Sequence, residues 1–166
     1  MGGSTLQAIR DLLDFRGIVY RETHHAPTRT SQQSAAARGE PMDIGGKAIV
    51  LKVDDDFRLF VLSAALHLHS AAIRKHLCAQ RTRFATEAEL FALTGLVPGC
   101  VPPFGPPILP FDPYVDVSIY ENDRIAFNAG SLSDSIVMAR ADWERVVHPA
   151  GVFRFARRSG SGGPPP

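Results

Sequence analysis

The stretch from Lys47 to Ser63, KAIVLKVDDDFRLFVLS, holds two apolar runs joined by a short acidic segment. Runs rich in β-branched and aromatic residues around a polar connection of three residues are typical of a β-hairpin. We expect one strand over residues 47–53, a turn at 54–56 and a second strand over 57–63. Because neither run alternates with polar residues, both faces of these strands should be covered, which places them centrally in a sheet.

Shorter segments on either side have helix or strand patterns. Helices are predicted between a Ser4 cap and Gly17, between Ser31 and Gly39, and over residues 70–77, 86–94 and 141–147, the last capped near its start by Asp142. Strands are predicted over residues 18–21, 114–120, 124–128 and 135–139. Hairpins interleaved with helices favour an α+β (mixed α/β) fold, with a curved, mostly antiparallel mixed sheet flanked by helices.

Length and composition predict one domain. The chain has 166 residues, of which 45% are hydrophobic, enough for a single core. We expect this domain over residues 1–158 and a disordered Gly/Pro/Ser tail, SGSGGPPP, over residues 159–166. No apolar run reaches the roughly 18 residues needed to span a bilayer, and the N-terminus lacks a signal-peptide pattern, so a cytoplasmic protein without a membrane partner is expected.

The charge balance argues against a long nucleic acid as the ligand. Eighteen basic and 17 acidic side chains give a formal charge of +1, which excludes a strongly basic arm. The densest basic segment, IRKHLCAQRTR over residues 73–83, has a charge pattern suited to contacting a few phosphates. A solvated helix face with Ile73 and Leu77 turned inward is the favoured interpretation of the same segment.

Residues 95–113, GLVPGCVPPFGPPILPFDP, contain seven prolines and three glycines. Prolines at this density exclude a helix or a central strand, because each lacks a backbone N–H and fixes φ. The sequence therefore predicts a stiff loop, and a stiff loop can hold a functional site.

Common catalytic motifs do not occur. The chain has no Walker A motif, no G-x-G-x-x-G and no G-x-S-x-G. Two histidine pairs, His24-His25 and His67-x-His69, lack a diagnostic metal-ligand spacing. We expect no metal and no other cofactor, with a histidine-based metal hydrolase kept as a weaker alternative.

Three short motifs occur in a set order: Lys47-Ala48-Ile49-Val50, a loop from Gly99 to Pro103 (GCVPP), and a turn from Asn128 to Ser131 (NAGS). In this order they resemble the YbaK-type family of trans-acting aminoacyl-tRNA editing domains, related to the editing insertion of bacterial prolyl-tRNA synthetases. The resemblance extends over residues 6–158. It is strongest to the free-standing branch that clears seryl- and threonyl-tRNAs, through residues 94–104 and the segment IAFNAG at 125–130.

This resemblance implies a deacylase that hydrolyses mischarged tRNA, with the tRNA acceptor end as partner; whether it also docks on a synthetase stays open. It implies catalytic roles for Lys47 and Gly99. The substrate-binding residues it implies are Thr30, Cys100, Val101, Pro102, Pro103, Asn128, Gly130, Ser131 and Ser135. Some related members have a histidine shortly after the NAGS turn, whereas this chain has Ser131, Leu132 and Ser133, so a histidine mechanism does not carry over.

Elementary chemistry is compatible with this interpretation. An aminoacyl ester is already activated, so its hydrolysis needs mainly a positioned water and donors for the developing oxyanion, each worth about 3 kcal/mol. Gly99 would let the backbone approach the ester, and Lys47 would supply a compact cation. The polar groups expected for a pocket selecting serine or threonine are Thr28, Thr30, Ser31 and Ser131. Thr30 and Ser31 are also candidates for a helix cap, and this role is favoured for Ser31.

Two alternatives remain at this level. Lys47 could be an ordinary solvated residue at the end of a strand. The chain could also be a binding module that holds an aminoacyl or tRNA end, or a synthetase, without hydrolysis.

Overall fold

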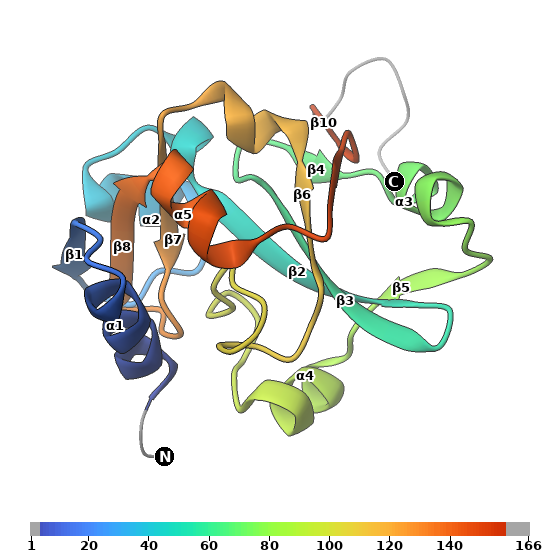
Figure 1. Cartoon of the computed structure of the whole chain (residues 1–166), viewed down its shortest axis with the longest axis horizontal. Helices are drawn as coiled ribbons and strands as arrows, with labels where there is room; N and C mark the ends of the chain where they lie inside the picture. Colours follow the sequence, from blue (N-terminus) through green and yellow to red (C-terminus); the bar gives the residue numbers. More distant parts are fainter. Residues whose placement is uncertain (1–3, 159–166) are drawn as a thin grey trace.

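The computed structural model describes residues 4–158, and its centre is the predicted hairpin (Figure 1). Strands β2 (Gly46–Val53) and β3 (Asp56–Ser63) pair antiparallel over their whole length, from Gly46 opposite Ser63 to Val53 opposite Asp56. Both strands lie inside a five-stranded sheet of order β5-β2-β3-β6-β9, which confirms their central place. The other strands of this sheet are β5 (Thr82–Phe84) and β9 (Gly151–Phe153) at its edges and β6 (Pro113–Asp116) between β3 and β9.

A second sheet lies beside the first. It has the order β1-β8-β7, with β1 at Tyr20–His24, β7 at Arg124–Asn128 and β8 at Asp134–Ala139. A parallel bridge between Gly45 and Ala126 links it to the start of β2. A short pair, β4 (His67–Leu68) with β10 (Ala156–Arg157), completes the strands. Only β3–β6 and β6–β9 pair in parallel within the described chain, so the predicted mixed, mostly antiparallel α+β fold is confirmed.

Helices surround the sheets (Figure 1). They are α1 (Thr5–Phe15), α2 (Ser31–Arg38), α3 (Ser70–Leu77), α4 (Glu87–Thr94) and α5 (Arg140–Val147), with 3-10 turns η1 (Met42–Ile44) and η2 (Val117–Glu121). The side chain of Ser4 caps α1, and Thr86 with Glu89 forms a full capping box on α4. These contacts satisfy amide groups that a helix N-terminus leaves without partners, and they agree with the predicted starts.

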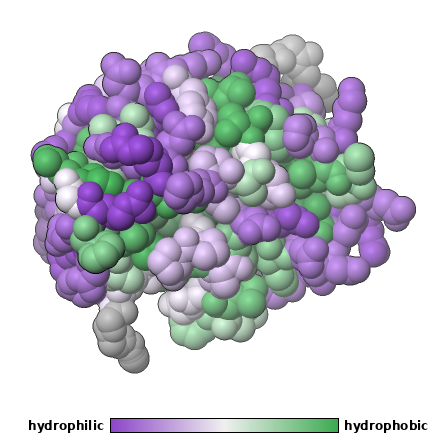
Figure 2. Space-filling model, in the orientation of Figure 1, coloured by the Kyte–Doolittle hydropathy of each residue, from purple (hydrophilic) through white to green (hydrophobic). Residues whose placement is uncertain are grey.

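The core explains why the hairpin is apolar on both faces. Val50, Leu59 and Val61 face the larger cluster, which also holds Trp143 of α5. Leu51, Phe60 and Leu62 face the opposite side and pack with Ile73 of α3 and Phe155. Alternate residues of each strand thus pack into different apolar clusters, which lie on opposite faces of the hairpin. The visible surface is mostly hydrophilic, with apolar side chains exposed around α4 (Figure 2).

Some predicted elements are wrong in their bounds. The strand predicted over 18–21 lies at Tyr20–His24, shifted by its pairing with β8. The strand predicted over 114–120 stops at Asp116, because the chain turns into η2 when the Asp116 carboxylate accepts from the Ser118 backbone N–H at 2.9 Å. The short strands β4, β5, β9 and β10 were not predicted.

Two predicted helix caps are also wrong. The cap of α2 is Thr30, whose hydroxyl accepts from the Gln33 N–H at 3.1 Å, and Ser31 is the first helical residue. Asp142 does not cap α5; it pairs with Arg145 within the helix.

The predicted tail at 159–166 lies outside the described residues. Between residues 4 and 158, no helix is both long and apolar enough to cross a bilayer. Cys78 is exposed and Cys100 buried, and both are free thiols.

Candidate functional site

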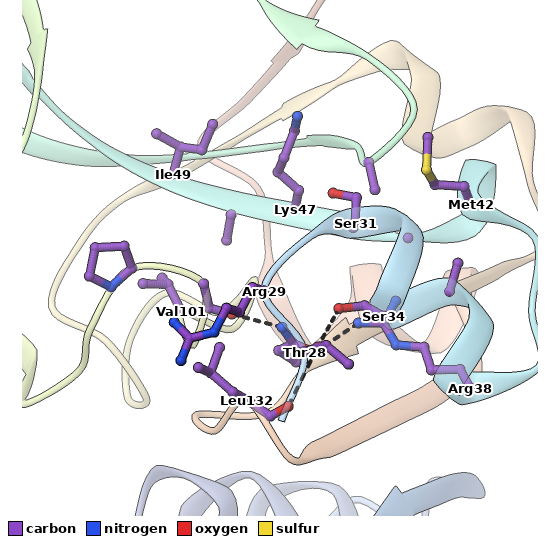
Figure 3. Close-up of a pocket in the computed structure, with 18 residues that line it drawn as sticks. Thr28, Arg29, Ser31, Ser34, Arg38, Met42, Lys47, Ile49, Val101 and Leu132 are labelled. Atoms are coloured by element: carbon purple, nitrogen blue, oxygen red, sulfur yellow. Dashed lines mark hydrogen bonds between the residues drawn. The ribbon is translucent and has the colours of Figure 1, made fainter. Parts of the chain in front are cut away.

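A cavity of about 230 Å³ lies between α2, the start of β2, the stiff loop and the turn after β7 (Figure 3). Four lining residues have no side chain or only a methyl group, namely Gly45, Gly46, Ala48 and Ala64. The lining residues are Thr28, Arg29, Ser31, Ser34, Ala35, Arg38, Met42, Gly45, Gly46, Lys47, Ala48, Ile49, Ala64, Pro98, Gly99, Val101, Asn128 and Leu132.

All the charged side chains that line the cavity are cationic. Its lining includes three cationic side chains, Arg29, Arg38 and Lys47, and none of the lining residues is acidic. Arg29 is exposed at the rim, whereas Arg38 is buried and Lys47 half-buried. In a partly desolvated site such charges act more strongly than in water. The cavity therefore favours a small group that carries, or develops, negative charge.

Lys47 is the second residue of β2 and pairs with Leu62 of β3. Its ammonium donates to the Leu66 carbonyl at 2.7 Å. Burial lowers the pKa of Lys47, because the charged form loses solvation there. No carboxylate in residues 4–158 forms an ion pair with it, so its other two donors remain for a ligand.

The stiff loop is fixed from two sides. Gly99, at φ +91°, accepts a hydrogen bond at its carbonyl from Asn128 Nδ2 at 2.8 Å. The next carbonyl, of Cys100, accepts from the Gly130 N–H at 3.0 Å. At the far end of the loop, Trp143 Nε1 donates to the Pro103 carbonyl at 2.9 Å. The proline-rich segment is thus tied both to the turn after β7 and to α5.

The structure brings four of the predicted site residues to the cavity wall. These are Lys47, Gly99, Val101 and Asn128. The other seven lie outside the lining. Thr30 caps α2, and Cys100, Pro102 and Pro103 are buried in the stiff loop. Gly130 packs against α1, Ser131 follows it in the turn, and Ser135 is buried on β8.

Of the polar groups expected for the pocket, Thr28 and Ser31 line it. The Thr28 hydroxyl lies 2.7 Å from the hydroxyl of Ser34, a residue that the sequence did not single out. Figure 3 shows this pair facing each other on the α2 side of the cavity. Ser131 accepts at its hydroxyl from the Ser133 N–H instead. The hydroxyl wall is therefore built by Thr28, Ser31 and Ser34.

Arg38 is the main residue of the site that sequence reasoning missed. It ends α2, where a basic residue is ordinarily attributed to the helix dipole. The side chain is instead buried, and burial lowers its pKa to about 10. A cationic residue that ends an otherwise uncharged helix, SQQSAAAR, is the only signal in the sequence that could have pointed to it.

The histidines do not form a metal site. Across residues 4–158, no three His, Cys, Asp or Glu side chains are placed to hold a metal ion. His24 contacts Asp134, and His25 contacts Ser135, while His67 and His69 lie beside β10. The metal-hydrolase alternative therefore has no candidate ligand set in this part of the chain.

The Gly99→Ala substitution should reduce function more than stability. At φ +91° an alanine is strained by about 1–2 kcal/mol, and its Cβ would meet Leu132 Cδ2 at 3.2 Å at the cavity wall. We expect the loop to shift and the rate of the ester hydrolysis that the resemblance implies to fall at least about tenfold, while the melting temperature falls by several degrees. Gly95→Ala is the control, because Gly95 has a similar φ of +74° and its Cβ would meet no atom within 4 Å. An equal rate loss in both variants would contradict a special role for Gly99.

Fold and cavity together define an α+β protein with one small cationic site closed by a rigid glycine loop. The chain belongs to the aminoacyl-tRNA editing domain family, whose model matches residues 25–146. This confirms the resemblance drawn from the three motifs.

Individual relatives agree with this assignment. The chain is 31% identical over 157 residues to the multifunctional Ser/Thr-tRNA deacylase ProXp-y of Escherichia coli K12, covering 89% of this chain and 91% of the relative. It is 26% identical over 137 residues to a proline–tRNA ligase of Macrococcus caseolyticus, covering 82% of this chain but 24% of that protein. A crystal structure described as a candidate trans-editing enzyme for prolyl-tRNA synthetase superposes with a TM-score of 0.79 at 22% identity, covering 92% of this chain and 97% of that one. That last likeness establishes the fold.

Proposed function

We propose that this protein is a free-standing aminoacyl-tRNA deacylase that hydrolyses the ester of mischarged tRNA, with seryl- or threonyl-tRNA as substrate. The observation that carries the proposal is the cavity, whose lining includes Lys47, Arg38 and Gly99 of the fixed loop and no acidic residue. Family membership and the similarity to a Ser/Thr-tRNA deacylase support it. The proposed partner is the tRNA acceptor end, and the proposed place of action is the cytoplasm.

In the proposed reaction, water attacks the ester carbonyl carbon and the bond from that carbon to the ribose oxygen breaks. The products are a free amino acid and a tRNA whose ribose oxygen has taken up a proton. The carbonyl oxygen becomes negative on the way, and backbone N–H groups of a preorganised loop together with a nearby cation stabilise such a charge. The loop from Pro98 to Val101 and the Lys47 ammonium are the groups proposed for this role.

Substrate selection is proposed to rest on the hydroxyl wall. A site built to hydrogen-bond a substrate hydroxyl rejects an analogue without it by about 10⁴-fold or more, because its polar groups then stay unpaired. Thr28, Ser31 and Ser34 supply such groups within one wall. Ala35, Met42 and Ile49 make the rest of the cavity apolar and keep it small, which suits a short side chain.

Contact with a synthetase is a second, separate proposal. It is motivated by the similarity of this chain to a segment of a proline–tRNA ligase. A cytoplasmic synthetase would deliver its mischarged product directly to the cavity.

The deciding experiment is a panel of tRNAs charged with serine, threonine, alanine, cysteine or proline and incubated with the purified protein. We expect release of free serine or threonine, and at least about tenfold slower release of alanine. An intact ester after prolonged incubation with stoichiometric protein would show a binding module instead. The same assay with a strong chelator should run at an unchanged rate; a loss that added zinc restores would support the metal alternative.

A further inference from the structure

From its place in the cavity lining, Arg38 connects two elements that are distant from it in the sequence. Its Nε donates to the Ser135 hydroxyl on β8 at 3.0 Å, and its NH2 group donates to Asn128 Oδ1 at the end of β7 at 3.0 Å. Asn128 in turn donates from Nδ2 to the Gly99 carbonyl at 2.8 Å. A continuous hydrogen-bonded chain therefore runs from β8 through α2 and β7 to the stiff loop.

The direction of each bond in this chain is fixed by chemistry. A guanidinium only donates, so the atom of Asn128 that faces Arg38 must be the amide oxygen. The amide nitrogen then faces the other way, where the Gly99 carbonyl only accepts. Arg38 and the Gly99 carbonyl thus require the same orientation of the Asn128 amide, and Arg38 is the group that holds its oxygen.

The Ser135 end of the chain is determined in the same way. His25 Nδ1 lies 2.9 Å from the Ala26 carbonyl and must donate to it, and in the imidazole form of the ring Nε2 is then an acceptor. The Ser135 hydroxyl lies 2.9 Å from that Nε2 and 3.4 Å from Asn128 Oδ1, so its one proton can go to either acceptor while its oxygen accepts from Arg38. Ser135 is fully buried and outside the cavity lining, so it supports Arg38 and does not meet a ligand.

Arg38 has this role without a paired carboxylate. Its side chain is buried, with 8% of the residue exposed, and none of the ion pairs in residues 4–158 includes it. The nearest acid that influences it, Glu40, is bound to Arg21 and Arg124. Burying a cation without an ion pair is unfavourable, and a purely structural linker would be served by a neutral side chain. We attribute the arginine to its chemistry, because a guanidinium donates hydrogen bonds and accepts none.

We propose that Arg38 is a positioning residue for the deacylation reaction: it orients the Asn128 amide, which holds the Gly99 loop in its working conformation. This inference rests on the proposed function for its catalytic readout. Its structural readout, the order of the loop, is independent of any substrate.

Asn128→Asp tests the orientation directly. The carboxylate keeps the size of the side chain and gains an ion pair with Arg38, but it cannot donate to the Gly99 carbonyl. We expect an unchanged or higher melting temperature and a kcat lower by about tenfold or more, the range seen when supporting residues of a site are removed. A variant with full kcat would overturn the proposal.

Arg38→Met and its combination with Asn128→Ala test the shared path. Each single variant should lower kcat, and the double variant should lose little more than either one, because both act through one chain of bonds. Losses that multiply in the double variant would show that the two residues act separately. Arg124→Met is the matched control, because Arg124 is an exposed arginine that pairs with Glu40 outside this chain.

Amide hydrogen exchange supplies the readout that does not need a substrate. In Arg38→Met and Asn128→Ala, exchange should become faster at Cys100, whose N–H donates to the Val97 carbonyl, and at Gly130, whose N–H donates to the Cys100 carbonyl. In Arg124→Met it should stay as in the unchanged protein. Unaltered exchange in Arg38→Met would refute the positioning role. If no tRNA is deacylated but exchange changes as expected, the proposed function fails and the positioning role stands.

Discussion

Lys47→Met should lower the rate of the proposed deacylation by about 100-fold or more, the usual cost of removing one donor that stabilises an oxyanion. The methionine keeps the length and the apolar stem of the side chain, so the start of β2 should keep its packing. Only one hydrogen bond, to the Leu66 carbonyl, disappears, which costs about 1.5–3 kcal/mol of folding free energy because the donor is charged. Single-turnover deacylation and a thermal melt measure the two effects separately.

Lys52→Met is the matched control for this prediction. Lys52 lies on the same strand but away from the cavity, with its ammonium 5.8 Å from the centre of the Phe57 ring. Its substitution should leave the rate within about twofold, the range usual for surface changes. Equal rates in Lys47→Met and the unchanged protein would make Lys47 an ordinary strand-end residue, which is the alternative that the sequence left open.

The pH profile gives a second measure of Lys47. Burial lowers its pKa, so the ammonium loses its proton at a lower pH than an exposed lysine does. If the charged form is the active one, the rate must fall as pH rises through this lowered pKa. The residual activity of Lys47→Met should lack that fall.

The sequence was sufficient for the parts of the fold that depend on local patterns. The hairpin and α4 were predicted close to their observed bounds, because an apolar run on both faces and a capping box are signals within a few residues. Two residues of the cavity lining, Lys47 and Gly99, could also be predicted, since each belongs to a contiguous motif. Their meeting at one cavity follows from the family resemblance and the structure, since no local pattern places β2 beside the stiff loop.

The remainder depends on contacts that are distant in the sequence. Arg38 meets Ser135 and Asn128 across 97 and 90 positions, and no pattern around residue 38 indicates these partners. The edge strands β9 and β10 are likewise short and set by their neighbours β6 and β4. Seven of the site residues expected from the sequence lie outside the cavity lining, because a motif marks a segment and not the direction of each side chain.

The misplaced end of the 114–120 strand points to a buried carboxylate that the sequence did not reveal. Asp116 is fully buried and accepts from three backbone N–H groups: Ser118 at 2.9 Å, Phe155 at 2.6 Å and Ala156 at 2.9 Å. It therefore ends β6, starts η2 and holds the C-terminal segment against the sheet. Three hydrogen bonds to a charged acceptor compensate the loss of solvation, since each is stronger than a bond between neutral groups.

Asp116→Ala should lower the free energy of unfolding by about 3–5 kcal/mol, because it leaves three buried N–H groups without an acceptor. That is a large part of the 5–15 kcal/mol typical of a domain, and urea unfolding followed by the fluorescence of the single tryptophan, Trp143, would measure it. Asp112→Ala is the control. The Asp112 carboxylate is 66% exposed, and its ion pair with Arg58 is long, at 3.8 Å, so the substitution should change the free energy of unfolding by less than about 0.5 kcal/mol. Similar losses of unfolding free energy in both variants would contradict the role of Asp116 as the shared acceptor of three buried N–H groups. A folded Asp116→Ala protein should keep its deacylation rate at low temperature, since Asp116 lies outside the cavity lining.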